Sequence, residues 1–191
     1  LAQACRQACA WQAAGLPKLC MSVNVSPIDF RQRGFVEGIE QVLEQTGLDP
    51  SLLELEITEG VLMQNVDATV SALNRIKDLG VRLAIDDFGT GYSSLSYLRR
   101  FPINVLKIDQ SFIRGLTLDS SDAALVSAII SLGKSLKLTI IAEGVETLEQ
   151  LDFLKAHQCE EGQGYYFSKP VEPDAFVQYM TSVKSPPFAA T

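Results

Sequence analysis

The sequence has few of the residues that build thiolate and imidazole metal sites. It contains one histidine and four cysteines among 191 residues, and no two cysteines form a Cys-x-x-Cys pair. A Cys/His zinc site needs several such ligands close together, so we do not expect one. Cys5 and Cys9 are spaced to share a helix face. We interpret all four cysteines as small apolar groups of a protein in a reducing compartment.

Positive charge and long apolar runs are also scarce. The net charge is −7, whereas binding to a nucleic acid polymer needs a basic face. An acidic protein that handles a phosphate substrate needs metal cations to offset the repulsion. No apolar run approaches the roughly 18 residues of a membrane span, and no signal peptide precedes the first helical pattern. We expect a cytoplasmic domain, whose parent protein can still be attached to a membrane.

The length and composition predict one globular domain. The chain has 191 residues, of which 47% are hydrophobic and 20% charged, as in ordinary folded proteins. We assign residues 1–182 to this domain and residues 183–191, which include prolines and alanines, to a tail. Because the sequence starts with Leu1 inside a helical pattern, without an initiator methionine, we expect it to be part of a longer polypeptide.

Six apolar stretches of strand character alternate with helical patterns. The strands are predicted at 19–26, 52–60, 81–85, 105–109, 138–144 and 161–170. The helices are predicted at 1–14, 30–46, about 66–79, 93–100, about 121–136, 146–157 and 173–180. Strands this apolar on both faces belong in a parallel sheet covered by helices, either a (β/α)₈ barrel or an open doubly wound sheet.

Polar residues at the strand ends favour the barrel. A different predicted strand delivers each of Asn24, Glu56, Asp86, Lys107, Glu143 and Gln163 near its carboxyl end. In a closed barrel these ends converge on one mouth, whereas in an open sheet they spread along an edge. The absence of a Gly-x-Gly-x-x-Gly fingerprint also weakens the dinucleotide-binding fold. We therefore predict an α/β TIM-type barrel that lacks its first two strands in this sequence.

The strand-end residues are suited to divalent metal chemistry. Asp86 and Asp87 end a buried strand and precede Gly89-Thr90-Gly91. The glycines of this loop let its backbone approach a ligand closely. Adjacent buried carboxylates need a nearby cation. Together with Asn24, Glu56 and Glu143 they form an oxygen-rich set that suits Mg²⁺ or Mn²⁺. Two such ions can clamp a phosphodiester, with Lys107 orienting a water and Asp109 as its neighbour.

Each of these residues also has a plainer interpretation. An acid or amide at a strand end is often a turn or helix-cap residue, and Glu59 fits the first turn of a helix. Lys107 can simply pair with an acid. Besides the metal enzyme and these structural roles, a third possibility is a Schiff-base aldolase that uses Lys107. The joint pattern at six strand ends favours the metal enzyme.

Six sequence blocks resemble one known family in order and content. VNVSP, LELEITEG, DDFGTGYSSL, LKIDQSF, IIAEGVET and QGYYFSKP are similar to the conserved blocks of EAL domains, which are bacterial cyclic di-GMP phosphodiesterases. The resemblance implies a (β/α)₈ barrel that hydrolyses cyclic di-GMP to linear pGpG with Mg²⁺ or Mn²⁺, two ions per site. It also implies a homodimer and adjoining sensor or GGDEF domains.

The resemblance assigns roles to individual positions. Metal ligands are implied at Asn24, Glu56, Asp86, Asp87 and Glu143. Lys107 matches the lysine that helps hold the attacking water, and Asp109 matches the acid beside it. Gln163 and Glu146 match residues at the substrate, and Glu59 matches the acid that holds the DFGTG loop.

The motif that names the family, Glu-Ala-Leu, is absent from the sequence. Its glutamate is a metal ligand and lies upstream with the first two strands. Either this sequence lacks the N-terminal portion of the domain or the protein is degenerate. We favour the first, because every later position carries the expected residue. The alternative function is a catalytically inactive EAL domain that binds cyclic di-GMP as a receptor.

Overall fold

The computed structural model describes residues 1–91, 95–116 and 121–182, so the predicted tail at 183–191 lies outside the described residues. The chain divides into two compact units that share strand β3 (Arg82–Phe88). The first unit consists of Leu1–Ile85 and Gly91–Ile103, and the second of Asp86–Thr90 and the chain from Asn104 onward.

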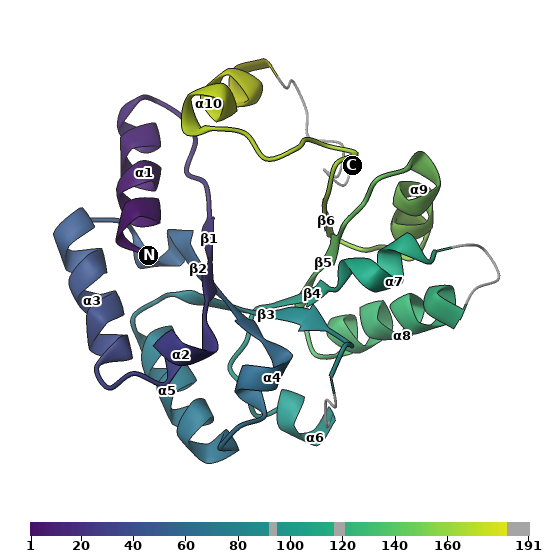
Figure 1. Cartoon of the computed structure of the whole chain (residues 1–191), viewed down its shortest axis with the longest axis horizontal. Coiled ribbons are helices and arrows are strands. Elements are labelled where there is room, and N and C mark those ends of the chain that lie inside the picture. Colours follow the sequence, from purple (N-terminus) through teal and green to yellow (C-terminus); the bar gives the residue numbers. More distant parts are fainter. Residues whose placement is uncertain (92–94, 117–120, 183–191) are drawn as a thin grey trace. The chain divides into compact units, whose positions relative to one another are not determined.

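The first unit begins with a helix and contains two complete strands. Its elements are α1 (Ala2–Ala13), β1 (Met21–Val25), α2 (Pro27–Phe30), α3 (Phe35–Thr46), the 3₁₀ turn η1 (Pro50–Leu52), β2 (Leu53–Thr58), α4 (Glu59–Leu62), α5 (Val66–Asp78), the start of β3 and α6 (Leu95–Leu98). The strand order is β1-β2-β3, and β1 and β2 are parallel. Helices α1, α3 and α5 pack in sequence beside one another (Figure 1).

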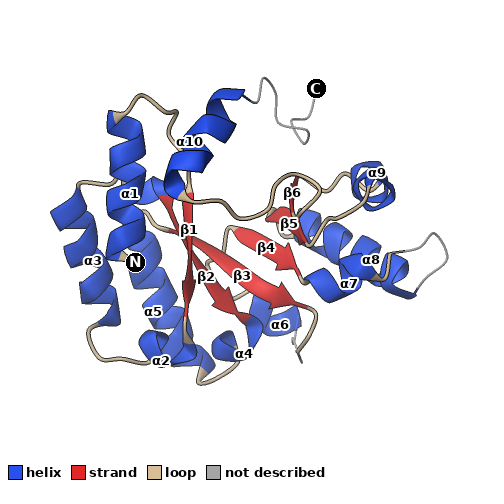
Figure 2. Ribbon diagram, turned by 45° about the horizontal axis from the view of Figure 1, so that its top comes forward, coloured by secondary structure: helices blue, strands red, loops and turns tan. Residues whose placement is uncertain are grey.

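The second unit repeats the alternation of strand and helix. It contains the end of β3, β4 (Val105–Ile108), α7 (Gln110–Arg114), α8 (Ser121–Ser135), β5 (Thr139–Glu143), α9 (Leu148–Ala156), β6 (Glu161–Gln163) and α10 (Pro173–Ser182). The strand order is β3-β4-β5-β6, with β4, β5 and β6 parallel. Helices α7 and α8 pack against each other and against β5 (Figure 2).

Alternation along the strands separates the core from the polar face. In β2, Leu53, Leu55 and Ile57 are almost completely buried on one face, while Glu54 and Glu56 occupy the other. In β4, Leu106 and Ile108 are completely buried on one face, and Lys107 lies on the other. The helices supply the matching apolar stripe: α3 buries Val36, Ile39 and Leu43 at the spacing of one helix face. Apolar strand faces therefore pack on helices and leave the acids on the opposite face.

Several boundaries differ from the predicted ones for local reasons. The strand predicted at 161–170 ends at Gln163, because the chain turns at Gly164, whose carbonyl accepts the N–H groups of Phe167 and Ser168. The helix predicted from residue 30 is interrupted at Gly34, which is left-handed with φ 85°. Residues 93–94 of another predicted helix lie outside the described residues, and its described part is α6.

Three short helices and a later helix start were missed. Helix α2 begins at Pro27, before the helix predicted from residue 30. Helix α4 begins at Glu59, inside the predicted strand, and α7 begins where the side chain of Asp109 accepts the N–H of Ser111. Helix α9 starts at Leu148 rather than at residue 146, because Thr147 and Gln150 form a capping box there. Within the described segments, no helix combines the length and apolar character that crossing a membrane would require.

Candidate metal and substrate site

The first unit places two of the predicted ligands on neighbouring strands. Asn24 of β1 and Glu56 of β2 are partners in the parallel register, so their side chains share one face. Glu56 is only 6% exposed, whereas Asn24 is exposed. Two residues earlier on the same face, Glu54 accepts a hydrogen bond from Ser22 Oγ at 3.0 Å and pairs with Arg82. Glu54 is therefore accommodated by polar partners on both adjoining strands.

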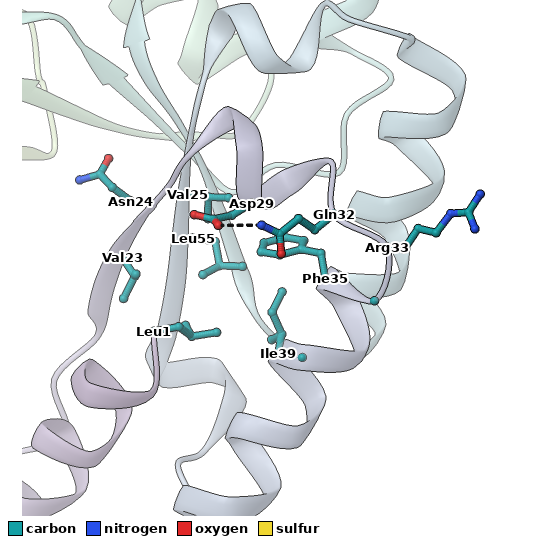
Figure 3. Close-up of a pocket in the computed structure, with 12 residues that line it drawn as sticks. Leu1, Val23, Asn24, Val25, Asp29, Gln32, Arg33, Phe35, Ile39 and Leu55 are labelled. Carbon is teal, nitrogen blue, oxygen red and sulfur yellow. Dashed lines mark hydrogen bonds between the residues drawn. The ribbon is translucent and has the colours of Figure 1, made fainter.

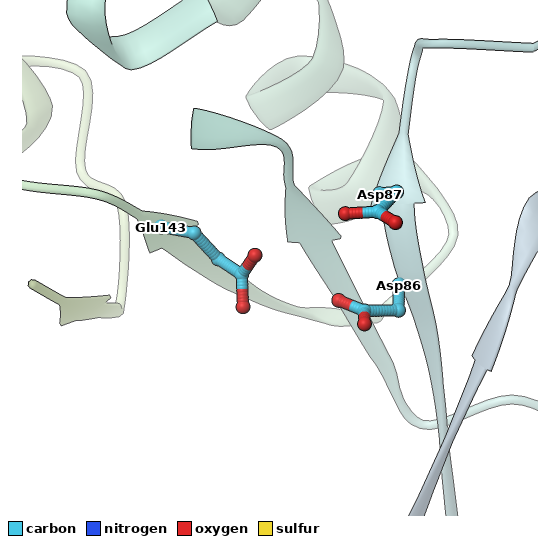
Figure 4. A group of neighbouring side chains, drawn as sticks. All are labelled: Asp86, Asp87 and Glu143. Atoms are coloured by element: carbon cyan, nitrogen blue, oxygen red, sulfur yellow. The ribbon is translucent and has the colours of Figure 1, made fainter. Parts of the chain in front are cut away.

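The second unit brings three charged predicted residues into direct contact. Lys107 Nζ lies 3.0 Å from Asp86 Oδ1 and 2.6 Å from Glu143 Oε1. The lysine is 3% exposed, so the two carboxylates offset the cost of removing its ammonium from water. In Figure 4 the carboxylates of Asp86 and Glu143 point toward each other from β3 and β5. Three consecutive strands of the sheet thus contribute one charged group each to the same point.

Asp87 has an unusual backbone conformation and an unusual protonation equilibrium. Its φ is +53°, in the left-handed region that non-glycine residues rarely adopt. Burial, the charges of Asp86 and Asp109, and a hydrogen bond with Asp109 raise the pKa of Asp87. A nearby divalent cation would oppose this shift, because it favours the ionised carboxylate.

Asp109 is held ionised by its donors. Burial alone raises the pKa of Asp109, but hydrogen bonds from the side chain and N–H of Ser111 and from Asp87 outweigh burial and lower it. The Ser111 N–H lies 3.0 Å from Asp109 Oδ1, and the Ser111 hydroxyl donates to the same oxygen. Asp109 therefore caps α7 and orients Asp87 at the same time.

The acids of the second unit fit a divalent metal ion. Asp86, Asp87 and Glu143 each offer an oxygen, and these oxygens all lie within 4.8 Å of one another. Asp86 Oδ1 is buried, and among the described residues no donor gives it a hydrogen bond. Its proximity to Lys107 is therefore an ion pair without hydrogen-bond geometry. An oxygen-only set with one unsatisfied buried oxygen suits Mg²⁺ or Mn²⁺.

The turn after β3 is packed closely in each unit. Gly89 has φ +100°, and a Cβ there would lie 2.9 Å from Cε2 of Phe112 in α7. In the first unit, a Cβ on Gly91 would lie 2.7 Å from Oε1 of Glu59, which is 3% exposed. Gly89 is therefore required by its φ and by this close approach, whereas at Gly91 a Cβ would meet only the end of the Glu59 side chain. The Glu59 carboxylate thus lies beside Gly91.

The predicted substrate residues Gln163 and Glu146 line a cavity of about 220 Å³ beside Glu143. Gln163 and Glu143 are register partners on β6 and β5. The cavity is also lined by Gln110, Arg114 and Tyr165, which the sequence did not indicate. Tyr165 is 60% exposed. Gln110 and Arg114 come from α7, whose shortness hid them from helical periodicity, and they are linked by a hydrogen bond of 2.8 Å.

A second cavity of about 400 Å³ lies inside the first unit (Figure 3). Its apolar wall includes Val23, Leu55, Ile39 and Leu1. Asn24 also lines it, so the exposed predicted ligand of β1 borders this space.

The family model for the EAL domain matches residues 1–170. The chain belongs to the EAL-domain family. An EAL domain also accounts for the fold: the structure superposes on the solved structure of the PaMucR phosphodiesterase in complex with c-di-GMP with a TM-score of 0.88 and 43% identity, covering 92% of this chain and 71% of that one. The predicted fold class is confirmed as the α/β, TIM-type architecture, of which the described residues contain six strands.

Two curated relatives of this EAL domain come from Pseudomonas aeruginosa. Cyclic di-GMP phosphodiesterase NbdA is 43% identical over 96% of the chain, and the bifunctional diguanylate cyclase/cyclic di-GMP phosphodiesterase MucR is 45% identical over 90% of it. The matches cover 24% and 25% of those proteins, so the chain spans about a quarter of their length.

One solved relative of the EAL domain contains a metal and the dinucleotide. The Klebsiella pneumoniae BlrP1 manganese/cy-diGMP complex is 32% identical with a TM-score of 0.79, and the match covers 88% of this chain and 43% of that one. EAL domains therefore use divalent metals, in keeping with the oxygen cluster of the second unit.

Proposed function

We propose that this EAL domain is a metal-dependent phosphodiesterase that hydrolyses cyclic di-GMP to linear pGpG. The observation that supports it most directly is the buried Lys107 between Asp86 and Glu143, with Asp87 beside them. A site built only to bind an anion would surround it with cations. This one surrounds a single cation with acids, which suits metal ions that in turn hold a phosphodiester.

Asn24, Glu56, Asp86, Asp87 and Glu143 are the proposed ligands of two Mg²⁺ or Mn²⁺ ions. Such ions supply positive charge that polarises the phosphodiester and acidifies a water.

Lys107 is proposed to position the attacking water. Its ammonium is fixed by two short contacts, one to Asp86 and one to Glu143. The water oxygen forms a bond to phosphorus, the P–O3′ bond breaks, and the departing 3′ oxygen receives a proton, which leaves a 5′ phosphate on pGpG. Asp109 holds Asp87 through their hydrogen bond, and Glu59 holds the turn at Gly91.

Gln163 and Glu146 are proposed to contact the dinucleotide in the cavity beside Glu143. An amide can donate to a phosphate or base oxygen, and a carboxylate can accept from the guanine N–H groups. The supporting observation is that both residues line one cavity with the proposed metal ligand.

The test measures hydrolysis of cyclic di-GMP by the complete protein, from which this sequence derives, with Mg²⁺ or Mn²⁺. The product pGpG is separated and quantified. Asp86→Asn and Glu56→Gln are expected to lose nearly all activity while remaining folded. Matched controls are Asp67→Asn and Glu37→Gln, which change exposed carboxylates paired with Arg100 and Arg75. Undiminished activity of Asp86→Asn would contradict the proposal. Binding of cyclic di-GMP without hydrolysis would identify a receptor instead.

The partners of the whole protein are proposed from the relatives. MucR is a bifunctional protein with a diguanylate cyclase activity, and the chain spans only about a quarter of such relatives. We accordingly propose a homodimer with adjoining sensor or GGDEF domains and a cytoplasmic location for this one.

A further inference from the structure

A buried glutamine in α9 uses both ends of its amide to join two segments of the second unit. Gln150 is 8% exposed. Its Oε1 accepts the N–H of Glu146 at 2.7 Å and the N–H of Thr147 at 3.0 Å. Its Nε2 donates to the carbonyl of Ile113 at 3.1 Å, in the helix α7 that lies 37 residues earlier. The side chain therefore bridges the loop after β5 to α7.

The bridged loop is the one that carries the proposed site. It follows Glu143 directly and contains Glu146. A Cβ on Gly144 would lie 2.6 Å from the Cβ of Gln110, so the loop backbone packs directly on the first residue of α7. The Gln150 amide then ties the loop to Ile113, near the other end of that short helix. The two contacts together set how far Glu143 and Glu146 stand from Gln110 and Arg114 across the cavity of about 220 Å³.

Helix capping alone does not explain this arrangement. In the capping box, Thr147 Oγ1 accepts the N–H of Gln150 at 3.3 Å, and the Gln150 oxygen returns to the N–H of Thr147. The bonds to Glu146 and Ile113 are additional and reach outside α9. A carboxylate at this position would accept from the loop but could not donate to the Ile113 carbonyl, and a thioether cannot donate and accepts only weakly.

We propose that Gln150 is a positioning residue for the hydrolysis of cyclic di-GMP. It holds the segment from Glu143 to Glu146 against α7, and so keeps the metal-ligand side of the cavity at a fixed distance from the α7 side. This inference rests on the proposed function for its effect on turnover. Its structural part, the restraint of the loop, is measured independently of any activity.

The experiment compares Gln150→Met and Gln150→Glu with two controls. Leu151→Ala opens the buried core at the next residue of α9, which is 2% exposed, without touching the loop. Thr147→Ala removes the hydroxyl cap and leaves the Gln150 bridge. In all four variants we would measure the melting temperature, the amide exchange rates of Glu146 and Thr147, and kcat and KM.

Gln150→Met is expected to speed exchange at both amides and to lower kcat roughly 10- to 100-fold, as for other residues that orient catalytic groups indirectly. Gln150→Glu restores protection of the two amides but recovers only part of kcat, because the tie to α7 is still lost. Leu151→Ala and Thr147→Ala lower the melting temperature and keep kcat within about threefold of the wild type, the change expected when only stability is affected.

Two results would overturn the proposal. One is that the amides of Glu146 and Thr147 in Gln150→Met exchange at the same rate as in the wild type. The other is a loss of kcat in Thr147→Ala as large as that in Gln150→Met, which would reduce Gln150 to a helix cap. If the wild type did not hydrolyse cyclic di-GMP, the proposed function would fail. The exchange rates would then still test whether Gln150 restrains the loop. The affinity of each variant for cyclic di-GMP would be measured in place of kcat.

Discussion

The Nζ of Lys107 lies 2.6 Å from Oε1 of Glu143, on the adjacent strand, and both residues belong to the polar face of the sheet. This contact and the 3.0 Å contact with Asp86 balance a buried ammonium against two acids. Because positive charge is what the two carboxylates need, replacing Lys107 and adding a metal ion should both act on Asp86 and Glu143. The predictions below follow from this relationship and from the packing around it.

Replacing Lys107 by methionine should destabilise the metal-free protein. Removing one partner of a buried ion pair leaves uncompensated charge and costs about 3–5 kcal/mol. Urea unfolding in the presence of a chelator measures this change in the free energy of unfolding. Mn²⁺ should recover part of the stability, because a cation can again stand between Asp86 and Glu143, but hydrolysis should remain lost. Lys77→Met at an exposed position is the control, and equal stabilities of the two variants would refute the prediction.

Metal should stabilise the protein more as the pH rises. The raised pKa of Asp87 means that its contribution to stability is fully present below its ordinary value of 3.8 and is lost as the pH rises through the raised pKa. A divalent ion removes this penalty by binding the ionised carboxylate. The Mn²⁺-induced rise in melting temperature should therefore grow with pH above about 4. The growth should be smaller in Asp87→Asn, and an identical pH dependence in the two proteins would contradict it.

The two glycines Gly89 and Gly38 should respond in opposite ways to alanine. At Gly89 the left-handed φ and the 2.9 Å approach to Phe112 both oppose a Cβ, so Gly89→Ala should cost about 1–3 kcal/mol and lower the hydrolysis rate. Gly38 lies inside α3 with no atom within 4 Å of an added Cβ, so Gly38→Ala should stabilise by about 0.5–1 kcal/mol. Thermal unfolding of both variants checks the signs, and a neutral Gly89→Ala would show that the turn is adaptable.

Cys159 should resist thiol reagents in the folded protein. Burial raises the pKa of its thiol to about 12 from an ordinary value of 9.0. The thiolate fraction at pH 8 is then about a thousandfold lower than that of a free cysteine. Modification by a disulfide reagent should label the exposed Cys20 first and Cys159 only on unfolding. The raised pKa also predicts that the stability Cys159 contributes is lost as the pH rises from about 9 to about 12. Rapid labelling of Cys159 in a Cys20→Ser variant would contradict this.

Much of the site could be anticipated because it lies at strand ends. A strand alternates its faces with a period of two, so apolar residues at Leu53, Leu55 and Ile57 left Glu56 on the opposite face. The same reasoning placed Lys107 in β4 and Glu143 at the end of β5. The order of consecutive strands then put Asp86, Lys107 and Glu143 on neighbouring strands.

Other parts could not be predicted because they depend on contacts between distant residues. Arg114 and Gln110 sit on a helix of five residues, too short for a periodic signal. Gln150 looked like an ordinary polar residue of a helix, and only the fold brought its amide to the carbonyl of Ile113. The left-handed backbone of Asp87 likewise has no local cause in the sequence, since aspartate does not require it.

Local chemistry thus determined the strands, their acid-bearing face, the six family blocks and the kind of metal the oxygens suit. Tertiary structure alone decided which of those groups touch: the ion pairs of Lys107, the hydrogen bond between Asp87 and Asp109, and the bridge made by Gln150. The physical reason is that side-chain periodicity is set within a few residues, whereas charge balance and hydrogen bonding in a buried site depend on groups that the chain brings together only when it folds.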